Sequence, residues 1–210
     1  LIILESGIFA LAICPCNCST AELSQVASSL PIDAAAVVAH TAGSVPVDAL
    51  ARFPRRAVFY PFQTFTKGRE VDFSEIPILV ETASPDLRGE VEAFARCLSR
   101  TVLYADSALR GQVHLAGVFA CNFANHLFEL GGEVLRRAGV SADLLRPLIA
   151  ETTAKALAAA RPAAVQTGPA VRGDLPTQER HLRLLADDAL LSDIYRLITQ
   201  SIWETSRKIS

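Results

Sequence analysis

Residues 76–105, IPILVETASPDLRGEVEAFARCLSRTVLYA, contain the pattern on which the fold class rests. Ile76–Glu81 is a short apolar run typical of a strand buried on both faces, and Thr101–Ala105 is a second. Between them, Ser84 and Pro85 cap and start a helix. Strand, helix and strand in this order predict a βαβ unit in a mainly parallel sheet.

Upstream of this unit the same alternation continues. We expect three further strands, at Ile8–Cys14, Ala35–His40 and Ala57–Tyr60. Ser19 and Glu22 form a capping box that opens a helix, and Pro46 suits the first turn of a shorter one. The sequence therefore predicts a Rossmann-like α/β domain over residues 1–106, although it contains no G-x-G-x-x-G phosphate turn.

After Asp106 the strand pattern stops and only helical periodicity remains. Ser107 is placed to cap a long helix that Gly139 ends. A further helix is expected at 141–160, with a kink at Pro147. A Pro- and Gly-rich loop over 161–175 follows it, and two last helices are expected at 176–186 and 188–208. The predicted fold class is α/β plus all-α, with a Rossmann-like parallel-sheet domain at 1–106 and a helical domain at 107–210.

The segment HLAGVFACNFANH, His114–His126, is apolar on nearly every face of a helix and is therefore expected to be buried. At about 100° per residue, its polar residues His114, Asn122, Asn125 and His126 fall within about 120°. Such a stripe is either a hydrogen-bonded seam between core helices or a polar pocket facing a ligand. Because this helix is the first after the sheet domain, we favour a pocket in an interdomain cleft. His114 and Asn122 are then candidates for chemistry, and Asn125 and His126 for holding the helical domain or a dimer together.

Three predicted strand ends carry small or polar residues, and open parallel sheets bind ligands beyond such ends. The first end is Cys14-Pro15-Cys16. The second is His40–Ser44, in which Gly43 would let the backbone approach a ligand closely. The third is Tyr60–Phe65, in which Gln63 and Thr64 offer uncharged donors and acceptors. Turn chemistry can explain each end alone, but three ends facing one cleft predict a site.

The loop TGPAVRGD, Thr167–Asp174, is a second candidate site. Arg172 can hold a carboxylate or phosphate through two hydrogen bonds. The alternative is a helix connection with an Arg172–Asp174 surface pair. Because long loops in compact domains are often functional, we favour substrate binding by Arg172 and Asp174.

The composition argues against several functional classes. A net charge of −2 gives no reason to expect a nucleic-acid or membrane partner. No run of 18 uncharged apolar residues and no signal segment is present, so a cytoplasmic protein is expected. Cys14, Cys16 and Cys18 lack a second ligand pair at zinc-site spacing, and we expect no metal.

Several longer strings carry a family resemblance. They are HTAGSVP at 40–46, VFYPFQTFTKGREVDF at 58–73, HLAGVFACNFANH at 114–126, PLIAETTAKAL at 147–157 and QTGPAVRGD at 166–174. They resemble the uncharacterised Rossmann-type NADP oxidoreductase-like proteins of bacteria, in which a helical domain of unknown function follows a dinucleotide-binding domain. The layout is similar, more distantly, to pyrroline-5-carboxylate reductase, deazaflavin-dependent NADP reductase and the β-hydroxyacid dehydrogenases.

The resemblance implies an NADP (or NAD) cofactor, a small-molecule substrate and a homodimer formed through the helical domain. It places Cys14 and Pro15 beside the nicotinamide ribose, and Thr41, Gly43 and Ser44 in the next strand-end loop. Cys14 stands where the related reductases have a Lys, and the first helix after the sheet lacks the Lys of the hydroxyacid dehydrogenases.

These observations predict an NADP-dependent oxidoreductase that transfers hydride to or from a small polar carbonyl or imine. His114 would be the general acid or base, because an imidazole titrates near neutral pH, and Asn122 would polarise the substrate. Gln63, Thr64 and Arg172 would orient the substrate. The alternative is a non-catalytic ligand-binding or sensor protein that has kept the fold, which the missing phosphate turn favours.

Overall fold

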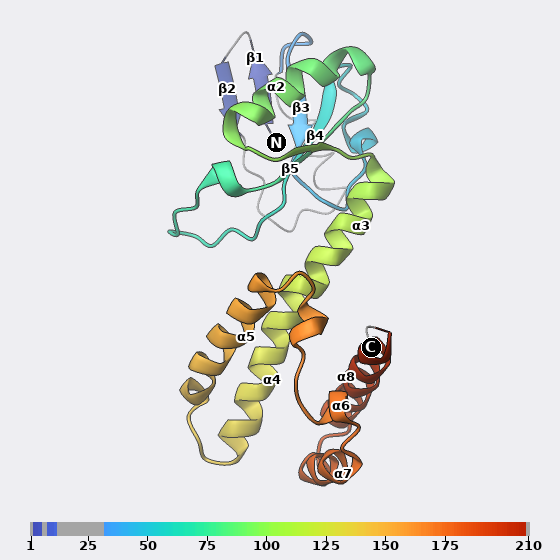
Figure 1. Cartoon of the computed structure of the whole chain (residues 1–210). Helices are drawn as coiled ribbons and strands as arrows, with labels where there is room; N and C mark the ends of the chain where they lie inside the picture. Colours follow the sequence, from blue (N-terminus) through green and yellow to red (C-terminus); the bar gives the residue numbers. More distant parts are fainter. Residues whose placement is uncertain (1, 6–7, 12–31, 209–210) are drawn as a thin grey trace. The chain divides into compact units, whose positions relative to one another are not determined.

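The computed structural model describes residues 2–5, 8–11 and 32–208 of the chain (Figure 1). The chain forms two compact units, Leu1–Asn122 and Phe123–Ser210. The sequence prediction placed the domain boundary after residue 106, because the strand pattern stops there. That boundary is based on secondary structure and not on compactness, and it stays a prediction.

The first unit is built on a six-stranded sheet in the order β2-β1-β3-β4-β5-β6. Its strands are β1 (Ile2–Glu5), β2 (Ile8–Leu11), β3 (Val37–His40), β4 (Arg56–Pro61), β5 (Ile78–Thr82) and β6 (Val102–Tyr104). The β3–β4 and β5–β6 pairs are parallel, whereas the β1–β2, β1–β3 and β4–β5 pairs are antiparallel. The Rossmann-like class is confirmed, with a sheet that is mixed in its pairings. The capping box at Ser19 and the end of the strand predicted at Ile8–Cys14 lie outside the described residues.

The antiparallel β4–β5 pair follows from the length and content of its connection. Residues 62–77 contain only the short 3₁₀ turn η2 (Phe73–Glu75) and no crossover helix. Parallel neighbours need a crossover, while antiparallel neighbours do not. Pro61 is therefore opposite Ile78, and the carboxyl ends of β3 and β4 lie at the edge where β5 begins.

Alternating side chains of the strands make cores on both faces of the sheet, as period-2 strands require. On one face, residues such as Val37, Phe59 and Val80 pack with Val91 of helix α2 (Arg88–Leu98). Figure 1 shows α2 lying across this face. On the other face, Val38 packs with Leu50 and Phe53, at and after the 3₁₀ turn η1 (Val47–Leu50).

Two further segments of the first unit differ slightly from the sequence prediction. The helix expected from residue 85 begins with the 3₁₀ turn η3 (Pro85–Leu87) before α2. Helix α3 (Ser107–Gly117) is capped by Asp106, whose side chain accepts from the Leu109 amide at 2.8 Å, and Ser107 is its first residue. A carboxylate at the N-cap position satisfies one of the free amides of the first turn.

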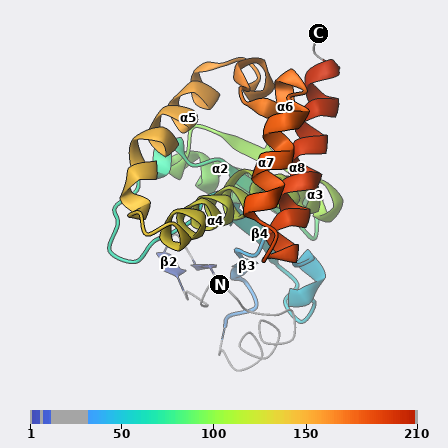
Figure 2. The ribbon, with the colours of Figure 1, turned by 90° about the horizontal axis from the view of Figure 1, so that it is seen from below.

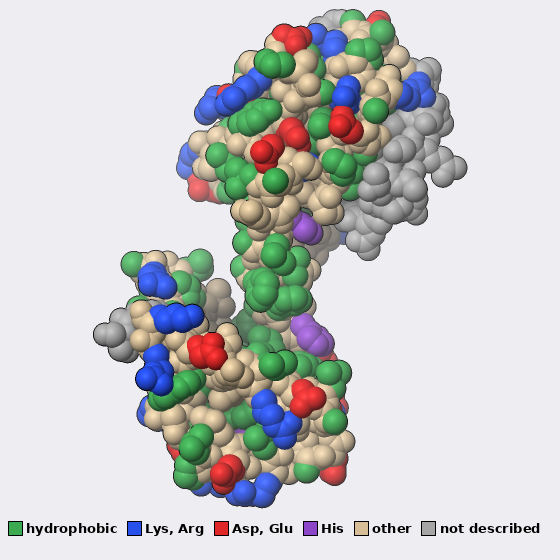
Figure 3. Space-filling view, turned by 90° about the vertical axis from the view of Figure 1, so that its right-hand side faces the viewer, with side chains coloured by type: hydrophobic (Ala, Val, Ile, Leu, Met, Phe, Trp, Pro, Cys, Tyr) green, Lys and Arg blue, Asp and Glu red, His purple; other side chains and the backbone are tan. Residues whose placement is uncertain are grey.

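The predicted long helix is made of three consecutive parts. After α3 comes the π-helical segment η4 (Val118–Phe123), and then α4 (Ala124–Arg137). The expected burial of this stretch is wrong, since Leu115 is 56% exposed and Phe119 is 63% exposed. Figure 3 shows hydrophobic side chains gathered on its surface. The expectation rested on the rule that a helix apolar on nearly every face is buried, and these side chains depart from that rule.

The second unit is entirely helical in its regular structure. After α4 it contains η5 (Ala142–Leu145), α5 (Arg146–Ala158), η6 (Pro162–Val165), α6 (Pro169–Arg172), α7 (Leu175–Leu184) and α8 (Ala189–Arg207) (Figures 1 and 2). Gly139 ends α4 with a φ of 72°, as predicted from its place after the helix. Pro147 lies in the first turn of α5 and makes no kink, because the first turn needs no proline N–H. The predicted loop over 161–175 contains η6 and α6.

Candidate functional site

The loop that follows β3 is closed by the imidazole of His40. This side chain is fully buried. Its Nδ1 accepts from the Ala42 amide at 3.3 Å, and its Nε2 donates to the Pro46 carbonyl at 3.2 Å. Burial lowers the pKa of His40 to about 4, so the ring is neutral near pH 7 with its proton on Nε2. The imidazole thereby joins the two ends of the loop.

The same loop is held from a second side by Arg110 of α3, which is 1% exposed. Its Nε donates to the Gly43 carbonyl at 3.2 Å, and its Nη2 donates to the Val45 carbonyl at 2.6 Å. Its Nη1 forms an ion pair with the Glu81 carboxylate near the end of β5. A buried guanidinium is stable only when its charge is balanced and its N–H donors have acceptors. Here the Glu81 carboxylate balances the charge, and the two loop carbonyls accept from the donors.

One helical turn after Arg110, His114 faces the end of β4. The Tyr60 hydroxyl lies 3.3 Å from Nδ1 of His114. Burial raises the pKa of Tyr60, and the positive charge of Arg110 opposes that rise in part. Tyr60 is therefore a protonated phenol at neutral pH, and it can donate to Nδ1 of a neutral imidazole.

Gly43 lies against this histidine–tyrosine pair. A Cβ at this position would be 2.7 Å from Cζ of Tyr60 and 2.9 Å from Nδ1 of His114. Only glycine therefore lets the loop pack against both rings. The sequence analysis assigned the close approach at Gly43 to a ligand, and the structure shows two side chains of the chain itself in that place.

The other residues predicted from strand ends have different surroundings. Thr41 and Ser44 are exposed on the same loop as buried Gly43. Gln63 and Thr64 are also exposed and line a polar hollow of about 360 Å³ with charged residues that include Arg69 and Asp72. Tyr60 and His114 are not among the residues that line this hollow. Cys14 and Pro15 lie outside the described residues.

The polar stripe predicted on His114–His126 is not joined by hydrogen bonds in the described part of the chain. Asn122, Asn125 and His126 are exposed, and none is recorded with a hydrogen bond to His114. Asn122 is in η4 and is the last residue of the first unit, while Asn125 and His126 belong to the second. A π-helical segment turns less per residue than an α-helix, so the phase assumed for Asn122 from a regular helix does not hold.

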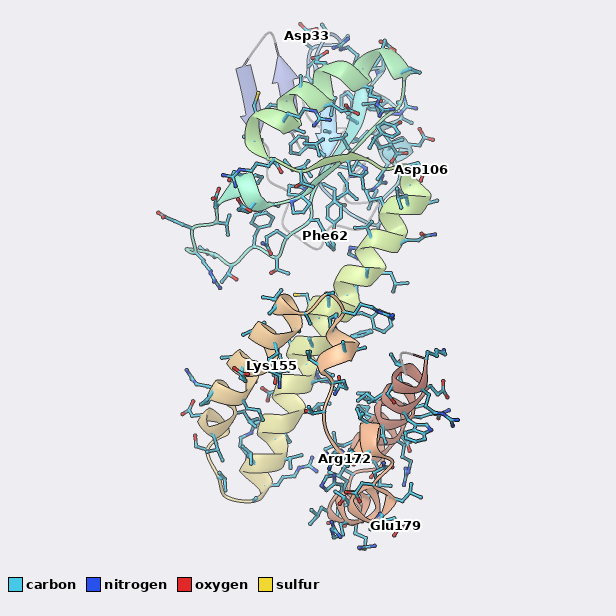
Figure 4. The ribbon with its side chains drawn as sticks, in the orientation of Figure 1. Asp33, Phe62, Asp106, Lys155, Arg172 and Glu179 are labelled. Atoms are coloured by element: carbon cyan, nitrogen blue, oxygen red, sulfur yellow. The ribbon has the colours of Figure 1, made fainter. Side chains whose placement is uncertain are left out.

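Arg172, which Figure 4 labels, and Asp174 both belong to the second unit. Arg172 is 65% exposed, and its Nη2 is 3.9 Å from Oδ2 of Asp174. Asp174 caps α7 by accepting from the Thr177 amide at 3.1 Å. The surface-pair alternative describes this contact, and the aspartate has a structural role as an N-cap. Neither residue lines the apolar hollow of about 440 Å³ that Gly173, Tyr195 and Trp203 help to form.

Four residues of the described site were not selected from the sequence: His40 and Tyr60, which begin two of the strand-end segments, and Glu81 and Arg110. Arg110 could have been found, because it precedes His114 by one turn and therefore shares its helix face. Glu81 closes an apolar run, and a carboxylate in such a place needs a cationic partner. Nothing in the sequence shows that these residues lie at one loop, since that depends on the pairing of β3, β4 and β5.

Neither a metal-ligating cluster nor a membrane-spanning helix is found among the described residues. Within the ranges 2–5, 8–11 and 32–208, no group of three or more metal-ligating side chains lies together. Cys14, Cys16 and Cys18 lie outside these ranges. None of the helices described is both long enough and apolar enough to cross a membrane.

The protein is of the class in which a Rossmann-like sheet unit is followed by a helical unit. In its sheet unit, hydrogen bonds from His40 and Arg110 hold the loop after β3. Within that class, the family model described as domain of unknown function DUF2520 matches residues 76–202, which is more than half of the chain. The chain belongs to this family, and the resemblance drawn from its sequence motifs is confirmed.

Two solved structures are similar to the chain. A protein of Bacteroides fragilis described as a putative NADP oxidoreductase is 40% identical, with a TM-score of 0.81 over 90% of this chain and 73% of that one. A protein of Thermotoga maritima is 23% identical, with a TM-score of 0.73 over 88% of this chain and 75% of that one, which shows the fold alone. No curated protein matches the chain.

Proposed function

We propose that this protein is an NADP-dependent oxidoreductase that transfers hydride to or from a small polar carbonyl or imine. The observation that carries the proposal is the Tyr60–His114 hydrogen bond over Gly43, at the carboxyl end of β3. Ligands of open sheets bind beyond such strand ends, and acid–base groups placed there can serve a reaction. The name of the Bacteroides fragilis relative supports the choice of reaction class and of NADP, with NAD as the alternative cofactor.

The loop after β3 carries polar groups of the kind that could bind the nicotinamide end of such a cofactor. Thr41 and Ser44 carry exposed hydroxyls at the strand end, beside a buried glycine. We assign these two residues to cofactor binding, and Gly43 to the packing that supports them. Cys14 and Pro15 are proposed to line the nicotinamide ribose on the strength of the family resemblance. When bound, NADP supplies the hydride, and the protein supplies position and proton transfer.

His114 and Tyr60 are proposed to move the proton that accompanies hydride transfer. When the phenol of Tyr60 donates to Nδ1 of His114, the ring proton is on Nε2, which lies on the side of the ring away from Nδ1. No hydrogen bond from Nε2 to another described residue is recorded. The Nε2–H can therefore donate to a substrate oxygen or nitrogen, and a water can return the proton to the ring.

The remaining predicted residues are proposed to bind substrate. Asn122 would polarise the reacting group, Gln63 and Thr64 would orient it, Arg172 would hold an anionic group of the substrate, and Asp174 is proposed as a further substrate-binding residue. Of these, Gln63 and Thr64 already line a polar hollow in the first unit.

We also propose a cytoplasmic homodimer formed through the helical unit. Leu148 and Leu157 of α5 and Leu197 of α8 are each between 62% and 82% exposed, and large apolar side chains exposed on a helical unit are candidates for burial against a partner. A second copy is the occupant that the family resemblance implies. Light scattering of the wild type and of Leu197→Lys tests this. A dimer that the substitution weakens is expected, and a wild-type monomer at about 50 μM would contradict it.

The test of the activity starts with titration of the protein by NADPH and NADH. Binding of NADPH in the micromolar range is expected, followed by a carbonyl or imine screen for nucleotide oxidation. We expect His114→Ala to lower kcat by about 100-fold or more and Tyr60→Phe to lower it by about tenfold. His126→Ala, an exposed histidine of the second unit, is the matched control. Nucleotide binding with no turnover of any substrate would favour a ligand sensor, and absence of binding would overturn the proposal.

A further inference from the structure

We infer that Arg110 is a positioning residue that aims the backbone amide of Ser44 at a hydrogen-bond acceptor of the bound nucleotide. The inference rests on the proposed function and concerns how the loop after β3 holds the nucleotide. It assigns Glu81 as the counter-ion that keeps the guanidinium in place.

The first step of the argument is that the guanidinium of Arg110 has no freedom left. Besides the contacts with Gly43, Val45 and Glu81, its Nη1 lies 3.5 Å from the Ala105 carbonyl and its Nη2 lies 3.4 Å from the Ser107 hydroxyl. These partners come from the ends of three strands and from the start of α3. A planar fork held at every edge is rigid, and the groups that it binds are held with it.

The second step follows from the planarity of the peptide bond. The C=O and N–H of a trans peptide point in opposite directions. Because the Gly43 carbonyl accepts from Nε of Arg110, the N–H of the same peptide, which belongs to Ser44, points away from the guanidinium. Gly43 is buried and Ser44 is exposed, so the peptide joins the buried guanidinium on its carbonyl side to an exposed residue on its amide side. No hydrogen bond from the Ser44 amide to another described residue is recorded.

The third step concerns strength. A cation bound to a peptide carbonyl polarises that peptide and makes its N–H a better donor, as in other hydrogen-bonded chains. His40 fixes the loop at Ala42 and Pro46, on either side of this peptide. The Gly43–Ser44 peptide is thus an oriented donor whose direction is set by buried groups. Its ligand is an acceptor oxygen, such as a carboxamide or phosphate oxygen of the nucleotide.

The inference is tested on the full chain by fluorescence titration with NADPH. Arg110→Lys keeps the charge but cannot reach both loop carbonyls and Glu81 at once, and we expect binding about tenfold weaker. Ser44→Pro removes the amide proton and is expected to weaken binding by a similar factor. Ser44→Ala keeps the amide and removes only the hydroxyl, so it is expected to weaken binding less than Ser44→Pro does. Arg88→Lys, which changes an exposed ion pair with Glu92, is the matched control for Arg110→Lys.

The double variant Arg110→Lys/Ser44→Pro decides between positioning and general structural support. If Arg110 acts through the Ser44 amide, the double variant binds no more weakly than Ser44→Pro alone, because the shared interaction is already lost. Losses that multiply would overturn the inference. If Arg110→Lys binds NADPH as tightly as the wild type does, the inference is also overturned. If the wild type binds neither NADPH nor NADH, the proposed function is overturned first.

Glu81→Gln keeps the inference testable if Arg110→Lys does not fold. This substitution removes the counter-ion and leaves the guanidinium in the chain, so we expect a weaker affinity that again disappears in the Ser44→Pro background. Hydrogen exchange of the peptide that contains residues 41–45 should rise in Glu81→Gln, while exchange in α2 stays unchanged. An unchanged loop would show that the ion pair does not hold it.

Discussion

The two units of this protein contain one histidine–tyrosine pair each, and the pairs differ in what surrounds them. In the sheet unit, Tyr60 and His114 come from a strand and a helix that are distant in sequence, and Gly43 of a third segment packs on them. In the helical unit, Nδ1 of His181 in α7 lies 2.9 Å from the hydroxyl of Tyr195 in α8. Beneath the first pair lies a buried ion pair, while the residue after Tyr195, Arg196, forms an exposed one with Asp193.

The units differ in the same way in their cores. Among the described residues, the buried hydrophobic side chains belong to the sheet unit except for Ala170 and Leu191. The sheet unit therefore has enough buried apolar surface to hold a charged group in a defined place. The helical unit leaves most of its leucines exposed and has little buried apolar surface around its histidine–tyrosine pair. The difference makes the first pair the better candidate for chemistry.

The largest effect is expected from breaking the buried ion pair. Arg110→Met leaves the Glu81 carboxylate buried without a partner, which should lower the free energy of unfolding by about 3–5 kcal/mol. Arg196→Met removes the exposed partner of Asp193 and should have no measurable effect. Urea denaturation of both variants makes the comparison. Equal losses in the two variants would contradict the contrast between the units.

The next effect is a pH dependence that originates at His40. Its pKa is about 4 in the folded protein and 6.5 in the unfolded chain, so between these values the unfolded state binds the extra proton. Stability is therefore complete above about pH 6.5 and falls as the pH drops toward 4, by about 3 kcal/mol in all.

Urea denaturation across this range measures the effect of His40. His40→Gln should flatten that part of the profile, since glutamine does not titrate, whereas exposed His126→Gln should leave its slope as in the wild type. A profile of unchanged slope in His40→Gln would assign the dependence to other groups.

A smaller effect is expected from filling the space at Gly43. Gly43→Ala puts a methyl group within 2.7 Å of the Tyr60 ring and should cost about 1–3 kcal/mol of stability, because overpacking forces neighbours to shift. Gly111→Ala in α3 meets nothing within 4 Å and should stabilise the protein by about 0.5–1 kcal/mol through helix propensity. Thermal unfolding distinguishes the two, and destabilisation by both would show that α3 tolerates no change.

The smallest effect separates the two tyrosines. Tyr60→Phe and Tyr195→Phe each remove the hydroxyl that is hydrogen-bonded to a histidine, and each should lower the free energy of unfolding by about 1 kcal/mol. Only Tyr60→Phe should change the pH profile of kcat. A change of that profile in Tyr195→Phe would place chemistry in the helical unit.

Much of the architecture follows from local patterns in the sequence. Short apolar runs predicted β3 to β6 within a few residues, and Gly139 ends α4 as its position indicated. The direction of β5 could not be predicted from its own residues, because a strand buried on both faces reads the same in a parallel or an antiparallel pair. The signal was the absence of a crossover helix between residues 62 and 77.

The candidate site was predictable only in part. His114 and Gly43 were selected from two unrelated segments, and the structure brings them into contact. The regular helical phase that grouped His114 with Asn122 failed at η4, where the turn widens. The sequence placed Gly43 beside a ligand because a glycine at a strand end permits close approach, and only the structure shows that side chains make this approach.

The sequence by itself determined that this chain has a sheet part followed by a helical part, and which family it belongs to. These properties depend on periodicity and on motifs, which are local. The tertiary structure decided that Arg110, Glu81, His40, Tyr60 and His114 meet at one loop. Such a meeting depends on strand order and direction, and these are set by the burial of the whole sheet and not by any one segment.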